Sequence, residues 1–331
     1  MTVLVTGGGG FLGGAIVRQL LQRGTPVRSF TRSPYPWLAE LGVEQCQGDL
    51  ANAADVERAV EGCDAVIHTA AKAGVWGRFK DYYSTNVVGT KNLLKAVARA
   101  GIAKFVFTST PSVVHHGGHI AGGNESLPYP KRYAAFYPET KALAERAVIA
   151  ANSPTLCTVS LRPHLIFGPG DPHLIPRVLA RGRAGKLRRI GAEPVVVDVT
   201  YIDNAAEAHL LALDRAAPGH AVAGRCYFIS NGEPVPLWDF LNRVLAGRGL
   251  PPVRRKSPAW LAHVAAALTE SLYRLLRLSA EPPLTRFVVE QLSTSHWYDI
   301  SAARRELAYI PRIGVDEGLR RMLAHAGLQS A

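Results

Sequence analysis

Short apolar runs alternate with helical stretches through the first half of the chain. Six runs have the length and β-branched content of buried strands, and glycines such as Gly24 and Gly101 end the helical segments between them. The predicted strands cover residues 2–7, 26–32, 43–49, 64–71, 104–110 and 157–163; the predicted helices cover 11–24, 55–62, 85–101 and 137–151. This alternation is typical of parallel strands joined by right-handed helical crossovers. We therefore predict an α/β protein with a Rossmann-type doubly wound parallel sheet.

The regular alternation fades after residue 163. Loops rich in proline and glycine separate helical runs there, and the sequence has no internal repeat. We predict a smaller, mixed C-terminal lobe whose loops close over the carboxyl edge of the sheet. The Rossmann domain would comprise residues 1–163 and about 196–226, and the second lobe about 164–195 and 227–331.

Residues 257–279 form the most apolar stretch of the second lobe. His263, Glu270, Arg274 and Arg277 interrupt it, so it lacks the roughly 18 uncharged residues that a membrane-spanning helix needs. We expect no membrane span. The favoured interpretation is an amphipathic helix that packs on the core or over a pocket, and the alternative is a helix at a membrane surface.

Composition and cysteine usage are those of a globular protein in a reducing compartment. Of the 331 residues, 47% are hydrophobic and 19% are charged. The four cysteines include no C-x-x-C pair, which argues against a zinc ribbon or a disulfide scaffold. The chain begins on a predicted strand without a charged segment before it, so a cytoplasmic protein is expected, with peripheral membrane contact as a variant.

The net charge of +12 indicates an anionic partner. The basic residues are dispersed and do not alternate with aromatic residues, so nucleic acid is not the expected partner. A phosphate-bearing cofactor and an acidic substrate fit this charge better.

A glycine-rich turn joins the first predicted strand to the first predicted helix. Gly7, Gly10 and Gly13 give the spacing G-x-x-G-x-x-G. Such glycines permit a tight turn, close approach of a pyrophosphate and close helix–strand packing, with the phosphates at the helix N-terminus. We predict a dinucleotide site, with Phe11 and Leu12 also in contact.

The end of the second predicted strand indicates which dinucleotide binds. An acid at this place would bind the ribose of NAD, but the chain has Thr31 and Arg32. A guanidinium can bind a 2′-phosphate, so NADP(H) is preferred and NAD(H) stays an alternative. The other interpretation of Arg32 is a solvated arginine beside a site that accepts both.

Tyr137 and Lys141 lie four residues apart in the stretch FYPETK. On a helix this spacing places both side chains on one face. A phenol has an ordinary pKa of about 10, and a nearby ammonium favours its ionised form. The pair is a weak signal by itself and gains weight only from the rest of the chain.

Several motifs together resemble the extended short-chain dehydrogenases/reductases: TGGGGFLG, GDL at 48–50, HTAA at 68–71, TNVVGT, STPS at 109–112 and YPETK. The stretches 199–213, 227–245 and 303–311 resemble the 3β-hydroxysteroid dehydrogenase branch of that family. A further resemblance, to bacterial reductases of 2-alkyl-3-oxoalkanoic acids in long-chain olefin biosynthesis, is carried by the stretches AKAGVWG, STPSV, RPHLIFGPGD, EPPLTRF and HWY.

The resemblance implies catalytic roles. Tyr137 would donate a proton to a carbonyl oxygen, and Lys141 would favour the phenolate and position the cofactor ribose. The family's third catalytic hydroxyl falls on Thr110, where serine is more usual. Ser112 points to the same side of an extended chain and is the second candidate.

The resemblance also implies cofactor contacts. Asp49 and Leu50 match the pair that contacts adenine, and Thr69 and Ala70 match the turn along the cofactor. Asn86 matches an asparagine that braces the active site. Pro163 and Ile166 match the loop beside the nicotinamide.

The predicted substrate is a hydrophobic acid. Its carboxylate would need a cation or a hydrogen-bond donor, and the candidates are His164, Lys72 and the histidines of 115–119. The cluster HHGGH lacks regular helical spacing, so we expect no metal.

The resemblance implies NADPH-dependent reduction of a 2-alkyl-3-oxo acid to the 3-hydroxy acid. The alternatives are oxidation of a 3β-hydroxysteroid or sterol-4-carboxylate with NAD(P)+, a nucleotide-sugar epimerase or dehydratase, and a non-catalytic NADP sensor. A homodimer through helices 85–101 and 138–151 is expected, and association with other enzymes of the olefin pathway would fit the resemblance to the reductases of that pathway.

Overall fold

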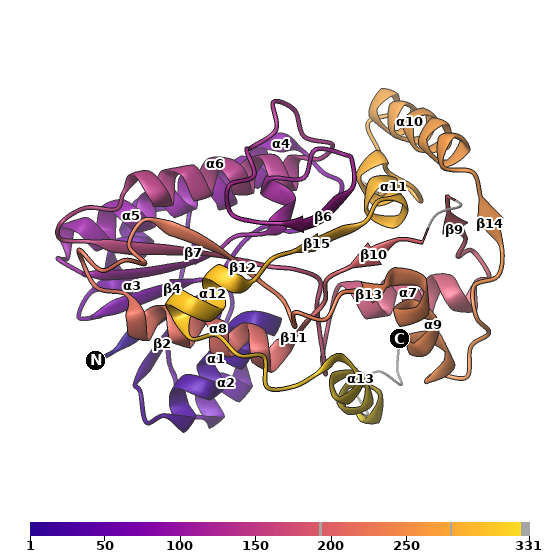
Figure 1. Ribbon diagram of the computed structural model, residues 1–331. Helices are drawn as coiled ribbons and strands as arrows, with labels where there is room; N and C mark the ends of the chain where they lie inside the picture. Colours follow the sequence, from indigo (N-terminus) through magenta and orange to yellow (C-terminus); the bar gives the residue numbers. More distant parts are fainter. Residues whose placement is uncertain (192–193, 279, 326–331) are drawn as a thin grey trace.

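A seven-stranded parallel sheet forms the centre of the protein (Figure 1). The computed structural model describes residues 1–191, 194–278 and 280–325. The six predicted strands are confirmed, and a further strand, β12, pairs with β7 and continues the sheet beyond residue 226. The order is β12 (Arg225–Ile229), β7 (Cys157–Pro163), β5 (Lys104–Thr108), β4 (Ala65–His68), β1 (Val3–Thr6), β2 (Val27–Thr31) and β3 (Glu44–Gln47).

The strand order reverses between β1 and β4. From β1 the chain builds β2 and β3 on one side, and it then crosses to β4 and builds the other side. In open parallel sheets ligands bind at such a switch point, beyond the carboxyl ends of the strands. The turns after β1 and β4 therefore face each other where a cofactor would bind.

Helices cover both faces of this sheet. α1 (Phe11–Gln22) packs against α8 (Ile202–Arg215) on one face. α3 (Ala53–Val60), α5 (Gly89–Arg99) and α6 (Phe136–Ala150) pack side by side on the other. Successive side chains of β1 point to opposite faces of the sheet. Val3 and Val5 therefore belong to the hydrophobic core on the first face, and Leu4 belongs to the core on the second.

The helix predicted over 85–101 begins earlier than expected. α4 (Phe79–Tyr82) continues through a π-helical turn (Tyr83–Val88) directly into α5. π-helical turns are rare and are frequent at functional sites. This one contains Asn86.

The second lobe has small sheets and helices around them. β10 pairs antiparallel with β13 and parallel with β15, so this sheet is mixed as predicted. The four-stranded sheet contains β13 (Val235–Pro236), β10 (Val196–Val197), β15 (His296–Tyr298) and β6 (Ile120–Gly123); β11 (Thr200–Tyr201) pairs with β8 (Ile166–Phe167), and β14 (Lys256–Ser257) with β9 (Arg189–Ile190). The helices are α7 (Leu174–Arg183), α9 (Leu237–Ala246), α10 (Ala259–Leu275), α11 (Arg286–Ser293) and α13 (Val315–Ala324); α2 (Pro36–Glu40), α12 (Ser301–Leu307) and a 3₁₀ turn (Pro111–Val113) complete the described elements.

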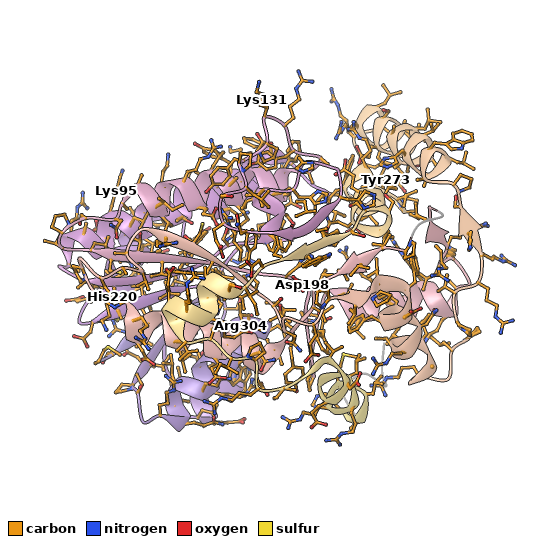
Figure 2. The ribbon with its side chains drawn as sticks, viewed as in Figure 1. Lys95, Lys131, Asp198, His220, Tyr273 and Arg304 are labelled. Carbon is orange, nitrogen blue, oxygen red and sulfur yellow. The ribbon has the colours of Figure 1, made fainter. Side chains whose placement is uncertain are left out.

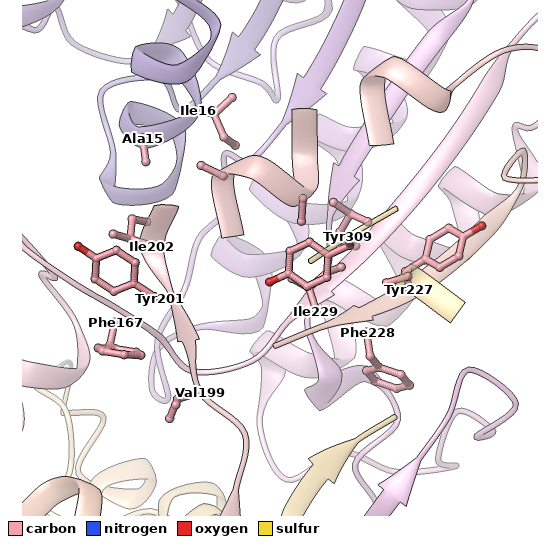
Figure 3. Packing of buried hydrophobic residues seen from close by; sticks show 14 of the residues in the cluster. Ala15, Ile16, Phe167, Val199, Tyr201, Ile202, Tyr227, Phe228, Ile229 and Tyr309 are labelled. Atoms are coloured by element: carbon pink, nitrogen blue, oxygen red, sulfur yellow. The ribbon is translucent and has the colours of Figure 1, made fainter. Parts of the chain in front are cut away.

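The two lobes share one hydrophobic core (Figure 3). Phe167 packs edge to face against Tyr201 and against Phe240 of α9, with ring centroids 5.7 and 5.2 Å apart. Ile16 of α1 belongs to the same buried cluster. Because this core is continuous, the position of the second lobe over the sheet is fixed by packing.

α10 is the helix predicted for the apolar stretch, but only one of its faces packs on the protein. Ala262, Ala266 and Glu270 are buried on the inner face, whereas Leu268 and Leu275 are 67% and 79% exposed. The expectation that the helix packs on the core is thus correct for half of its surface. No helix in the described parts of the chain has the length and apolarity needed to cross a bilayer.

Candidate active site

The glycine-rich turn after β1 packs closely against the first turn of α1. Gly7 has a φ of +73°, which favours glycine. A Cβ at Gly13 would lie 2.1 Å from the carbonyl oxygen of Gly7, so only glycine fits there. Gly10 is the N-cap of α1 and no side chain caps this helix. The first N–H groups of α1 can therefore bind an anion, and the turn fits the pyrophosphate of a dinucleotide.

A cavity of about 880 Å³ at the carboxyl edge of the sheet brings most of the predicted site residues together. Its lining includes Gly7, Gly10, Phe11, Leu12, Gly13, Thr31, Arg32, Asp49, Leu50, Thr69, Ala70, Thr110, Tyr137, Pro163 and Ile166. Lys141, Ser112 and Asn86 are not part of the lining. A second open cavity of about 990 Å³ lies between α1 and α8, and none of the predicted catalytic side chains lines it.

The end of β2 presents a cation to this cavity. Arg32 is exposed and makes no ion pair with any described residue. The Thr31 hydroxyl donates to the carbonyl of Ser33 at 2.9 Å. Asp49 belongs to the turn after the neighbouring strand β3, and its carboxylate accepts a hydrogen bond from the Ala51 N–H at 2.9 Å. β2 itself is followed by Arg32 and Ser33, so this strand ends without an acidic residue.

Tyr137 lies in the first turn of α6, with Thr110 beside it on the cavity wall. Burial raises the pKa of Tyr137 to about 12, and the Thr110 hydroxyl acts against this rise. Tyr137 is consequently a neutral phenol with a proton to donate. Both side chains line the cavity beside Pro163.

Lys141 lies one turn further along α6 and is buried. Its Nζ donates to the carbonyl oxygen of Thr108 at 2.5 Å and lies 4.0 Å from the ring centroid of Phe107. Burial lowers the pKa of Lys141 to about 7, although the Glu145 carboxylate acts in the opposite direction. The ammonium therefore gains or loses its proton near neutral pH.

The structure favours Thr110 over Ser112 as the third catalytic hydroxyl. Thr110 caps the 3₁₀ turn by accepting from the Ser112 N–H at 3.3 Å, and its own hydroxyl lies 3.3 Å from that of Ser112. Of the two, only Thr110 lines the cavity and affects the pKa of Tyr137. Ser112 contacts Thr110 and does not line the cavity.

Asn86 braces the site without lining it. Its Oδ1 accepts from the Lys72 N–H at 2.7 Å, and its Nδ2 donates to the Lys72 carbonyl and the Thr140 hydroxyl, both at 3.0 Å. The π-helical turn is thus tied both to the loop after β4 and to α6. This loop carries Lys72 into the cavity.

Sequence reasoning missed a buried ion pair beneath the catalytic helix. Arg162 of β7 donates to both carboxylate oxygens of Glu145 at 3.0 and 2.7 Å, and the Tyr129 hydroxyl donates to the same carboxylate at 2.6 Å. Both charged side chains are almost fully buried. The signal in the sequence was Glu145 four residues after Lys141, on the same helical face.

The histidines proposed for the substrate carboxylate are placed elsewhere. His164 is buried, and its Nε2 lies 2.6 Å from Nδ1 of His296. His115 is also buried, beside Thr294. None of these histidines lines the cavity, and the same holds for His116 and His119. Lys72 does line it, so Lys72 is the candidate that lies where a substrate carboxylate could bind. The described residues include no group of side chains able to hold a metal ion.

This geometry, a dinucleotide turn with a tyrosine and a hydroxyl side chain in one cavity, defines an oxidoreductase of the Rossmann class. The sequence profile of the 3-beta hydroxysteroid dehydrogenase/isomerase family matches residues 4–258, and the chain belongs to this family. The family is NAD(P)-dependent and acts on CH–OH and C=O groups.

Two particular relatives are about half identical over almost the whole chain. The 2-alkyl-3-oxoalkanoate reductase of Stenotrophomonas maltophilia is 51% identical over 98% of this chain and 99% of its own length. That of Shewanella oneidensis is 48% identical over 97% and 85%. The sterol-4-alpha-carboxylate 3-dehydrogenase (decarboxylating) of Mus musculus is 35% identical over 96% and 88%.

Solved structures with the same fold include two dinucleotide complexes. MoeE5 in complex with UDP-glucuronic acid and NAD has a TM-score of 0.73 at 26% identity, with 98% of both chains covered. The UDP-glucose 4-epimerase of Thermus thermophilus in complex with NAD has a TM-score of 0.71 at 27% identity over both full chains. These complexes support the assignment of the cavity to a dinucleotide.

Proposed function

We propose that this protein is an NADPH-dependent reductase that converts a 2-alkyl-3-oxoalkanoic acid into the 2-alkyl-3-hydroxyalkanoic acid in long-chain olefin biosynthesis. The observation that carries the proposal is the presence of Tyr137 and Thr110 together in the cavity that the glycine turn also lines. Two relatives with this activity in their names, at 51% and 48% identity, support the substrate class.

The preference for NADPH follows from Arg32. Its guanidinium is unpaired among the described residues, and no carboxylate at the end of β2 repels a 2′-phosphate. Gly7, Gly10 and Gly13 would hold the pyrophosphate. Asp49 and Leu50 would contact the adenine, and Thr69 and Ala70 would lie along the cofactor.

Tyr137 and Thr110 would carry the proton chemistry. When bound, reduced nicotinamide supplies the hydride for the carbonyl carbon. Thr110 donates a hydrogen bond that orients the substrate oxygen and stabilises its developing charge, and Tyr137 gives its phenolic proton to that oxygen. Protonated Lys141 stabilises the phenolate that remains until Tyr137 regains a proton from solvent.

Lys72 would bind the substrate carboxylate. It lines the cavity together with Tyr137, and its Nζ lies 5.4 Å from the ring centroid of Tyr82. Leu165, Ile166 and Leu174 add apolar surface to the same cavity for an alkyl chain. A β-keto acid has this combination of a carboxylate, a ketone one carbon away and apolar chains.

Oxidation of a sterol-4-carboxylate is the second candidate. The mouse sterol-4-alpha-carboxylate 3-dehydrogenase is 35% identical, and its substrate also carries a carboxylate one carbon from the reacting carbon. The two reductases are more similar over the same span, and Arg32 favours NADPH and hence reduction. A nucleotide-sugar epimerase is less favoured, since MoeE5 and the Thermus epimerase are 26% and 27% identical.

The test measures the oxidation of NADPH in the presence of a synthetic 2-alkyl-3-oxo acid. The reaction is monitored by the decrease in the near-ultraviolet absorbance of NADPH. We expect turnover with this acid, none with UDP-glucose, and almost none for Tyr137→Phe. Tyr129→Phe is the matched control, because Tyr129 bonds Glu145 and does not line the cavity. Full turnover by Tyr137→Phe would contradict the proposal.

A further inference from the structure

The outward side of α10 and the residues that follow it form a continuous apolar surface. The described chain exposes fifteen large apolar side chains, and eight of them lie between residues 260 and 278. These eight, which we name the α10 face, are Trp260, Leu261, Val264, Leu268, Leu272, Leu275, Leu276 and Leu278. α10 projects at the margin of the molecule, where Tyr273 marks it (Figure 1 and Figure 2). Such a concentration of exposed apolar side chains marks an interaction surface.

Hydrogen bonds to the buried carboxylate of Glu270 fix the orientation of α10. The Glu270 carboxylate is buried and accepts hydrogen bonds from the backbone N–H and Nε of Arg286 at 2.7 and 3.0 Å, and from Arg274 at 3.4 Å. Ala262 and Ala266 pack beside it against Val289 of α11. Rotation that buried the α10 face would expose these alanines and break the bonds of Glu270. The apolar side therefore faces outward because the fold holds it there.

Positive charge surrounds the α10 face. Residues 174–191 and 250–286 contain twelve Lys and Arg residues but only two Asp and Glu residues. Lys256 of β14 is the register partner of Arg189 of β9, immediately before α10 begins. Like charges on paired strands destabilise one another unless an anion lies between them.

Some of these cations have partners, as Arg177 has in Glu281, but four of them make no ion pair with a described residue. Arg188, Arg254, Arg255 and Lys256 are exposed, and none makes an ion pair with a described residue. They form a row beside an apolar helix, which we name the basic row. An anionic surface complements both features at once.

We propose that the α10 face and the basic row dock this protein on an anionic phospholipid surface. The α10 face enters the boundary between head groups and acyl chains, with Trp260 at the interface. The basic row binds lipid phosphates, and Arg277 extends from the end of the helix to the head groups. The protein lies on the membrane and does not cross it.

Docking would place the bilayer beside the entrance to the active site. Trp76 Nε1 donates to the Leu278 carbonyl at 3.3 Å, and its ring packs edge to face on Tyr273 with centroids 6.2 Å apart. Trp76 belongs to the same loop as Lys72, which lines the cavity. A water-insoluble acid could pass from the lipid to this loop; this consequence alone rests on the proposed function.

The experiment is co-sedimentation of the full chain with vesicles of phosphatidylcholine alone and of phosphatidylcholine mixed with phosphatidylglycerol. We expect binding to the mixed vesicles only, weakened by salt. Leu268→Asp with Leu272→Asp should lower the partition coefficient about tenfold or more, because charged side chains do not enter the acyl boundary. Leu41→Asp with Ile310→Asp is the matched control, since these exposed apolar residues lie outside the α10 face.

A second pair of variants tests the charges. Arg254→Glu, Arg255→Glu and Lys256→Glu together should lower partition by a similar factor. Arg58→Glu, Lys131→Glu and Arg215→Glu change the net charge equally at exposed sites elsewhere and should retain most of the binding. Circular dichroism and NADPH turnover of a short, water-soluble substrate check folding and separate this proposal from the proposed function.

Three results would overturn the proposal. One is a wild-type protein that does not sediment with mixed vesicles. Another is equal binding by the Leu268/Leu272 variant and its control. The third is self-association of the wild-type chain, lost in that variant without any vesicle binding, which would assign the α10 face to a second copy.

Discussion

Thr110 and Tyr137 place their side chains together on one cavity wall although they come from different elements: Thr110 caps the 3₁₀ turn after β5, and Tyr137 lies in the first turn of α6. The Thr110 hydroxyl lowers the pKa of Tyr137 against the larger effect of burial. Thr110 is therefore placed beside the proton donor, where its single hydroxyl hydrogen can turn to a substrate oxygen.

Removing the Thr110 hydroxyl should slow turnover strongly. We expect Thr110→Val to lower kcat by about 10²–10³-fold, the loss typical of one oxyanion-stabilising donor. Thr110→Ser should keep most activity because it keeps the hydroxyl. Ser112→Ala should have a smaller effect than Thr110→Val, and the reverse order in steady-state kinetics would transfer the catalytic role to Ser112.

Lys141 should give the reduction a pH limit near neutrality. Its pKa in the folded protein is about 7, below the ordinary 10.5, because of burial. Protonated Lys141 stabilises the phenolate after proton donation, so kcat/KM should fall as pH rises through about 7. Lys141→Met should lose most activity. The activity that remains should no longer show the fall of kcat/KM as the pH rises through about 7.

The same pKa of Lys141 predicts the pH dependence of stability. Between about pH 7 and 10.5 the unfolded lysine keeps its proton and the folded one has lost it. The unfolded state therefore binds more protons, and the free energy of unfolding should rise with pH across this window. Urea unfolding of the wild type and of Lys141→Met checks this, and an equal slope for both proteins would assign the dependence to other groups.

Arg32 should determine cofactor preference. Replacing it by Ala removes a charge-assisted bond to the 2′-phosphate, worth about 10- to 100-fold in kcat/KM for NADPH. The value for NADH should change little, since NADH lacks that phosphate. Arg58→Ala is the control, as an exposed arginine outside the cavity. Equal losses with both cofactors would show that Arg32 does not select between them.

Lys72 should matter more for an acid than for a neutral ketone. We expect Lys72→Met to raise KM for a 2-alkyl-3-oxo acid about tenfold and to leave KM for the corresponding dialkyl ketone, which lacks the carboxylate, nearly unchanged. Lys80→Met is the matched control, because Lys80 is exposed and does not line the cavity. Similar increases for both substrates would mean that Lys72 does not bind the carboxylate.

The sequence predicted the features that local patterns determine. Short apolar runs, separated by helices that end at glycines, predicted six strands of the central sheet. The spacing of Gly7, Gly10 and Gly13 predicted the turn at the point where the strand order reverses. Tyr137 and Lys141 share a helix, so their spacing indicated one face. Each of these signals lies within a few residues along the chain.

Features that depend on distant partners could not be predicted in this way. His164 follows a strand that borders the cavity, but His296, 132 positions later, pairs with it and keeps it in the interior. The apolar pattern of 257–279 indicated a helix, whereas the position of α11 decides which face is covered. Arg162 gave no local sign of its partner Glu145 on α6.

The ion pair of Glu145 and Arg162 should be a strong determinant of stability. Glu145→Gln leaves the buried Arg162 guanidinium without a counter-charge, which should lower the free energy of unfolding by about 3–5 kcal/mol. Glu57→Gln is the matched control, because its bond to Arg99 lies between exposed side chains and should be worth about 0–1 kcal/mol. Urea unfolding measures both variants. The double variant Glu145→Leu with Arg162→Met removes both charges and should be more stable than Glu145→Gln; if it is less stable, the cost lies in lost hydrogen bonds and packing, since no unpaired charge is then present.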